Sequence, residues 1–303
     1  MSRISVQRVE FVGFRGVRLR GESWGSPSAA PVLFLAGGGQ TRHAWGDTAA
    51  QVAARGWRAI TLDLRGHGES DWAEDADYSI ESFVQDLHAV VQSLGQSPVL
   101  VGASLGGITG LLLAGERNPQ AFSGLVLVDI APRMEPDGVQ RIVDFMRRHL
   151  DGFASLEEAA DAVASYLPHR PRPKDLSGLE KNLRRDPSGR YRWHWDPEFV
   201  LGPKRPDASR QPKRLLAAAR RLTIPTLLVR GRMSDVISYD SVREFLEAVP
   251  HARYVDVEQA GHMIAGDRND VFSAAVIDFL DNGLQPPPRS GNTFGTDTES
   301  PRG

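Results

Sequence analysis

Short, largely apolar runs alternate with segments of helical periodicity over most of the chain. Runs at 32–36, 57–62, 99–101 and 125–128 are typical of parallel strands that are buried on both faces. Between them, and again after a second group of such runs at 225–229 and 252–257, apolar residues recur at helical spacing. Two mixed segments at 6–14 and 17–24 predict an opening antiparallel hairpin. This order predicts an α/β fold with a mostly parallel central sheet and helices on both faces.

The alternation stops at residues 131–132, and no apolar strand run follows before about residue 222. Helical spacing at 139–150, 156–167 and 215–222 surrounds a dense aromatic patch at 191–195. We therefore predict that residues 133–222 form a helical cap, inserted into a core made of residues 1–132 and 223–283. The last residues, 284–303, are rich in Pro, Gly, Ser and Thr, and we expect them to be a disordered tail.

Composition narrows the function classes. The 303-residue chain carries a formal net charge of −2, so no global field favours nucleic acid or a membrane surface as partner. It has no cysteine, which excludes disulfides, thiolate zinc sites and a cysteine nucleophile. No secretory h-region and no apolar run of membrane-spanning length stand out, so the expected location is cytoplasmic, without an integral membrane segment.

The strongest chemical signal is a G-x-S-x-G pattern, formed by Gly102, Ser104 and Gly106. It lies between the strand at 99–101 and a helix that begins near residue 105. At such a turn the serine takes a strained conformation that exposes its hydroxyl, and glycines on both sides avoid crowding. An ordinary glycine-rich turn would show the same pattern, so the other strand ends have to decide.

In an open parallel sheet, functional groups gather beyond the carboxyl ends of the strands. Three further strand ends carry suitable groups, namely the glycines 37–39, Asp235 and His262. The chain order of Ser104, Asp235 and His262 is the order of the α/β-hydrolase triad. Histidine would activate the serine as a base, and the carboxylate would hold the histidine tautomer. Asp129, which also follows a strand, is the alternative acid.

Several stretches together resemble the α/β-hydrolase superfamily over residues 6 to about 280. They are GGGQTRHAW at 37–45, DLRGHGES at 63–70, the serine turn, and GHM at 261–263. More narrowly, the chain is similar to cap-bearing bacterial serine hydrolases, often labelled esterases or epoxide hydrolases. The resemblance implies an oxyanion hole made by the backbone N–H groups of Gly38 and Leu105. It departs at Ala36, where the family usually carries histidine before the first loop glycine.

The remaining expectations concern the substrate. We expect His43, Trp193 and Trp195 to line the substrate pocket, although His194 and its tryptophan neighbours could equally serve cap packing. No phosphate-loop, dinucleotide-binding or H-E-x-x-H zinc pattern occurs, so we expect neither a cofactor nor a metal. A small-molecule substrate is the expected partner, and a homodimer is the oligomeric alternative to a monomer.

These observations favour a serine hydrolase that cleaves a carboxylic ester or lactone through an acyl-enzyme. Hydrolysis of carbon–carbon, thioester or amide bonds and perhydrolysis use the same triad and remain open. Epoxide hydrolysis is a weaker interpretation, because those relatives use a carboxylate nucleophile where this chain has Ser104. A non-catalytic ligand-binding protein on the same fold is the alternative of another class.

Overall fold

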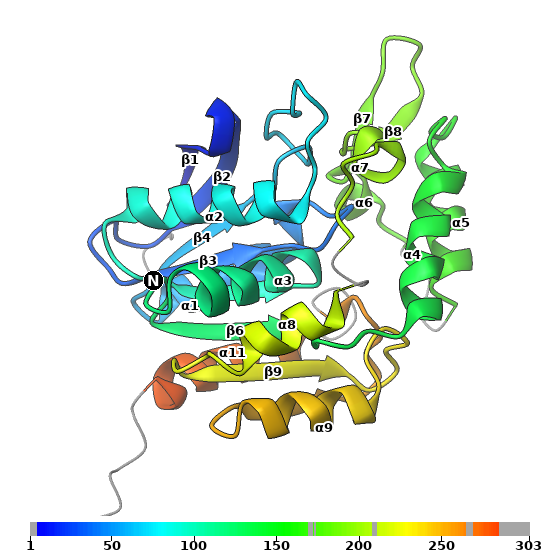
Figure 1. Cartoon of the computed structure of the whole chain (residues 1–303). Coiled ribbons are helices and arrows are strands. Elements are labelled where there is room, and N and C mark those ends of the chain that lie inside the picture. The colour runs from blue at the N-terminus through cyan, green and yellow to red at the C-terminus, as the bar shows by residue number, and fades with distance from the viewer. Residues whose placement is uncertain (1–4, 169–171, 173, 208–210, 265–268, 285–303) are drawn as a thin grey trace, which may run out of the picture.

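A computed structural model describes residues 5–168, 172, 174–207, 211–264 and 269–284 of the chain. Eight strands form one sheet in the order β1-β2-β4-β3-β5-β6-β9-β10 (Figure 1). They are β1 (Val6–Val12), β2 (Arg18–Trp24), β3 (Pro31–Leu35), β4 (Arg58–Leu62), β5 (Val99–Ala103), β6 (Gly124–Val128), β9 (Thr226–Gly231) and β10 (Arg253–Val257). Strand β2 runs antiparallel to β1 and β4, and the other neighbours are parallel. The predicted opening hairpin and mostly parallel sheet are confirmed.

Successive side chains of the central strands point to opposite faces of the sheet, and each face has its own apolar core. In β3, Leu33 and Leu35 belong to one core, whereas Val32 and Phe34 belong to the other. Helices α2, α3, α8 and α9 pack side by side on the first face, and α1 and α11 pack together on the second (Figure 1). Their bounds are α1 (Gly46–Ala54), α2 (Ile80–Leu94), α3 (Leu105–Leu112), α8 (Pro212–Ala219), α9 (Tyr239–Ala248) and α11 (Asn269–Asp278). Burial on both faces explains why these strands are continuously apolar.

The direction of strand addition reverses at β3. The chain passes from β3 to β4 on one side and later returns to place β5 on the other side of β3. Ligands of open α/β sheets bind at such a reversal, beyond the carboxyl ends of the strands. Here the loop at 37–40 follows β3 and Ser104 follows β5, so the topology brings them together.

The inserted segment lies beyond the carboxyl ends of the strands (Figure 1). It contains α4 (Pro136–Arg148), α5 (Leu156–Tyr166), α6 (Ser177–Glu180), β7 (Leu183–Arg185), β8 (Tyr191–Trp193) and α7 (Glu198–Leu201). Strands β7 and β8 pair as an antiparallel hairpin that the sequence did not lead us to expect, because its residues are mainly arginine and aromatic rather than apolar. Helix α8, the last element of the predicted cap, packs against α3 and α9.

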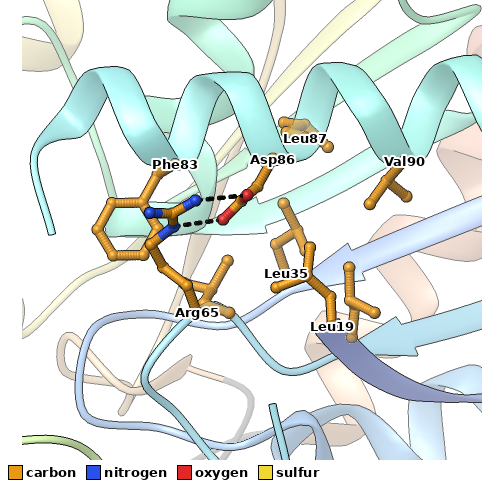
Figure 2. A pocket seen from close by; sticks show the side chains of 9 residues that line it. Leu19, Leu35, Arg65, Phe83, Asp86, Leu87 and Val90 are labelled. Carbon is orange, nitrogen blue, oxygen red and sulfur yellow. Dashed lines mark hydrogen bonds and ion pairs between the residues drawn. The ribbon is translucent and has the colours of Figure 1, made fainter. Parts of the chain in front are cut away.

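A buried ion pair anchors the loop after β4 beneath helix α2 (Figure 2). Arg65 donates to both carboxylate oxygens of Asp86, at 2.6 and 2.7 Å, and Phe14 N–H donates to the same carboxylate at 2.7 Å. Beside the pair lies a cavity of about 10 Å³, lined otherwise by apolar side chains, which is room for about one water molecule. This anchor fixes the start of the 65–70 loop, which reaches the candidate site.

Among the described helices, none combines the length and the apolar character needed to cross a bilayer. The expected disordered tail, residues 284–303, lies outside the described part of the chain except for Leu284. The division into core and cap at residues 132 and 223 stays a prediction.

Candidate active site

Ser104 occupies a strained turn between β5 and α3. Its backbone has φ 45° and ψ −116°, a conformation that costs free energy for a residue with a side chain. The flanking glycines make the turn feasible. A Cβ on Gly102 would lie 2.6 Å from the Gly107 nitrogen, and one on Gly106 would lie 2.6 Å from the Leu35 carbonyl oxygen. The predicted G-x-S-x-G turn therefore presents the serine at the carboxyl edge of the sheet.

The histidine is held by Asp129. Nδ1 of His262 lies 2.7 Å from Oδ2 of Asp129, and the aspartate side chain is fully buried. Asp129 also has a positive φ, 49°, directly after β6. Its carboxylate accepts two further hydrogen bonds, from Gly231 N–H at 3.0 Å and from the Ser234 hydroxyl at 2.5 Å. Three donors thus fix the carboxylate, and the His262 ring with it.

Asp235, which we predicted as the acid, is not at this position. Its side chain is 43% exposed and forms an ion pair with Arg141 of α4. The tight turn after β9 explains the difference. Ser234 N–H donates to the Gly231 carbonyl at 2.8 Å, and this turn directs Ser234 toward Asp129 while its neighbour Asp235 faces the cap. The geometry therefore favours the alternative acid, Asp129, over Asp235.

The glycine loop after β3 lies against the serine. A Cβ placed on Gly37 would lie 3.2 Å from Cβ of Ser104, and one on Gly38 would lie 3.8 Å from Cδ2 of Leu105. Among the described residues, the N–H groups of Gly38 and Leu105 have no hydrogen-bond partner, whereas Gly37 N–H donates to the Gln40 side chain at 3.1 Å. Two unpaired donors next to the Ser104 side chain have the composition of an oxyanion hole.

His67 also reaches this loop, a contact that sequence reasoning did not find. Its Nε2 accepts the Gly39 N–H at 2.9 Å, and its Nδ1 lies 2.9 Å from the Arg65 carbonyl oxygen. The ring is fully buried, and burial lowers the pKa of His67 below its ordinary value. The glycine-rich turn at 66–68 was visible in the sequence, but its contact with the loop at 37–40 was not.

The expected substrate-binding residues are divided by the structure. Trp195 is buried, and its Nε1 lies 3.8 Å from the position that a Gly39 Cβ would take. The ring of Trp193 packs against two other aromatic rings, with centroids 5.9 Å from Phe145 and 5.3 Å from Phe153. Of this pair, Trp195 is the one for which a contact with the glycine loop is observed among the described residues.

His43 lies on a short 3-10 helix, Arg42–Trp45, that follows the glycine loop. Burial lowers its pKa, and the charged groups that act on it are Arg42, Glu22, Asp63 and Lys181. None of these groups is Ser104, Asp129 or His262, so a role of His43 in the substrate pocket stays a prediction.

Two further residues of the inserted segment lie directly over the glycine loop. The Cε atom of Met146 (α4) is 2.9 Å from the position that a Cβ on Gly39 would take, and Cζ of Phe199 (α7) is 2.8 Å from the corresponding position on Gly38. Together with Trp195 they form an apolar wall above the unpaired N–H groups. Within the described ranges, no three His, Cys, Asp or Glu side chains are grouped to hold a metal ion.

Comparison with known proteins identifies the family of the chain. The family model described as alpha/beta hydrolase fold matches residues 30–268. The chain belongs to the alpha/beta-hydrolase family. The prediction of an alpha/beta-hydrolase enzyme, made from the resemblance of several sequence stretches, is thereby confirmed.

Individual alpha/beta hydrolases match over nearly the whole chain. The esterase Rv0045c of Mycobacterium tuberculosis is 31% identical over an alignment of 283 residues that covers 91% of this chain and 89% of the relative. The 3-hydroxybutyrate-oligomer hydrolase of Cupriavidus necator is 26% identical over 81% of this chain and 87% of its own. The crystal structure of an alpha/beta hydrolase from Novosphingobium aromaticivorans superposes with a TM-score of 0.78 at 26% identity, covering 92% of this chain and 99% of that one.

Proposed function

We propose that this alpha/beta hydrolase is a serine hydrolase that cleaves carboxylic esters or lactones, with Ser104, His262 and Asp129 as its triad. The observation that carries the proposal is the 2.7 Å contact between His262 Nδ1 and the buried Asp129 carboxylate. Asp129 directly follows Val128, whose carbonyl accepts the N–H of Ser104 at 3.1 Å, so the serine in its strained turn lies next to the acid. A carboxylate at Nδ1 leaves Nε2 of the ring free to accept the serine proton.

Each group has one task in the reaction. Ser104 Oγ attacks the acyl carbon while Nε2 of His262 accepts its proton, and the carbonyl oxygen becomes an oxyanion. The N–H groups of Gly38 and Leu105 stabilise that oxyanion, each contributing about 3 kcal/mol to lowering the barrier. His262 then returns the proton to the leaving alkoxide, and the acyl group stays on Ser104. Water, activated by the same histidine, releases the acid and restores the serine.

The ester or lactone class is supported by two kinds of observation. The wall formed by Met146, Phe199 and Trp195 offers apolar surface beside the oxyanion donors, which suits an apolar acyl group. The relatives named esterase and 3-hydroxybutyrate-oligomer hydrolase carry names that point to ester bonds. The cap residues are therefore proposed to set the substrate choice, and the acyl bond is proposed to be an ester.

The direct test is active-site labelling with a fluorophosphonate probe. The wild-type protein should form an adduct on Ser104, and Ser104→Ala should not be labelled. Turnover is then measured over p-nitrophenyl esters, lactones, thioesters and epoxides. Labelling of Ser104→Ala at the wild-type rate, or turnover of epoxides alone, would contradict the proposal. Ligand binding without turnover of any substrate would favour a non-catalytic binding protein.

A further inference from the structure

Both ring nitrogens of the buried His67 are occupied by backbone groups. Because the Gly39 N–H can only donate, Nε2 has to accept it, and because the Arg65 carbonyl can only accept, Nδ1 has to carry the proton. The ring is thus a neutral imidazole in a single tautomer. Among the described residues, no hydrogen bond joins His67 to His262 or Asp129. The triad mechanism therefore gives His67 no role.

The bond to Gly39 fixes one end of the glycine loop. Gly39 has φ +81°, and the loop is closed at its other end by the Gly37 N–H bond to Gln40. Gly38, whose N–H is the proposed oxyanion donor, lies between these two anchors. Gln40 N–H also donates to the Gly37 carbonyl at 3.2 Å and closes the turn, and the His67 bond adds a contact from outside the loop that sets the orientation of the peptide group joining Gly38 to Gly39.

The cap in turn holds His67 in place. Gly68 N–H donates to the His194 carbonyl at 2.6 Å, and Asp196 N–H donates to the Gly66 carbonyl at 2.8 Å, so the turn at 66–68 is paired with the cap backbone. The ring of Phe199 packs edge-on against the His67 ring, with centroids 4.6 Å apart. The same Phe199 ring lies over Gly38.

We infer that His67 is a positioning residue that holds the oxyanion loop in its active shape, and that the cap segment 194–199 keeps His67 there. The inference rests on the proposed serine-hydrolase function. His67 exchanges no proton with the substrate; it acts through the Gly39 N–H. Docking of the cap is thereby coupled, through His67, to the geometry of the oxyanion hole.

The test uses two variants that divide the two hydrogen bonds. His67→Asn keeps a short side-chain donor for the Arg65 carbonyl but is too short to reach Gly39. His67→Gln places a carbonyl oxygen near the position of Nε2 and so restores the acceptor. A misplacement of about 1 Å in an active site costs about a hundredfold in rate. We therefore expect kcat of His67→Asn to fall by about tenfold to a hundredfold with KM within about threefold, and His67→Gln to recover most of that loss.

Melting temperatures of both variants separate positioning from stability. Wild-type kcat in His67→Asn would overturn the inference, and so would equal losses in both variants that follow their melting temperatures. If neither variant folds, imidazole ¹⁵N shifts of the unmodified protein decide, because a proton on Nε2 of His67 would overturn the inference.

Ser104→Ala is measured in parallel. An active Ser104→Ala refutes the proposed function, whereas an inactive Ser104→Ala beside a fully active His67→Asn refutes only the role of His67.

Discussion

Replacing Asp129 by asparagine changes one atom of the proposed triad and nearly none of its shape. The asparagine would keep its oxygen toward the Gly231 N–H, and its amide nitrogen would then face Nδ1 of His262. Because that amide donates, it favours the imidazole tautomer with the proton on Nε2. This tautomer cannot accept the proton of Ser104.

The expected loss is large. In a related triad, the same change from aspartate to asparagine lowers kcat by about 10⁴, which corresponds to about 5 kcal/mol of activation free energy. We expect a loss of this size for Asp129→Asn. The charge-assisted bond from Ser234 is also lost, at a cost of up to about 3 kcal/mol in stability, which a domain of this size can tolerate.

Asp235→Asn is the matched control. Its ion pair with Arg141 joins side chains that are 43% and 62% exposed, and exposed pairs of this kind contribute about 0–1 kcal/mol. We therefore expect its turnover of a p-nitrophenyl ester to stay within about fivefold of wild type. Both variants are assayed after circular dichroism has shown that they are folded. A folded Asp129→Asn with near-normal turnover, beside an inactive Asp235→Asn, would refute the assignment of the acid.

Three further changes test other parts of the molecule. Asp86→Asn leaves the buried Arg65 charge without its partner and should lower the free energy of unfolding by about 3–5 kcal/mol, measured by urea titration. A change below about 1 kcal/mol would show that the pair is not an anchor. Met146→Ala opens space above Gly39 and should raise kcat/KM for branched relative to acetyl esters by about tenfold; an unchanged ratio would remove Met146 from the acyl site. Burial lowers the pKa of His67, so the unfolded chain binds a proton near pH 6.5 that the folded chain rejects, and stability falls as the pH drops below that value. The melting temperature of His67→Gln should therefore fall less than that of wild type between pH 7.5 and 5, and equal falls would contradict this.

The features that sequence could predict are those with a fixed local geometry. The central strands could be predicted because burial on both faces makes them continuously apolar. The serine turn could be predicted because Gly102 and Gly106 have no room for a Cβ, which keeps glycine at both positions. Because functional groups gather beyond the carboxyl ends of parallel strands, the sequence also grouped the glycine loop with Ser104, while the order of the strands stayed open. The sequence therefore pointed to every member of the proposed triad except its acid, for which Asp129 was the alternative.

That one residue depended on the direction of side chains in a turn. Asp129 and Asp235 both follow parallel strands, and only the turn after β9 shows that Ser234, not Asp235, faces the Asp129–His262 pair. The β7–β8 hairpin escaped prediction because Arg184 and Arg185 give it no apolar run. The hydrogen bond between His67 and Gly39 could not be predicted because it joins two loops that are separate in sequence.

The sheet is divided by sequence as well as by space. All six strands that precede the insertion are contiguous in it, and β9 and β10 extend one edge. The border between β6 and β9 therefore joins the segment before the insertion to the segment after it. The Asp129 carboxylate, which follows β6, accepts its hydrogen bonds from Gly231, Ser234 and His262 across this border. If β9 and β10 separated from the sheet, the contact between His262 and Asp129 would break and Ser104 would lose its base, while the other six strands stayed folded. Hydrolytic activity would then depend on the pairing of β6 with β9. On mild denaturation, the activity would be lost before most of the secondary structure.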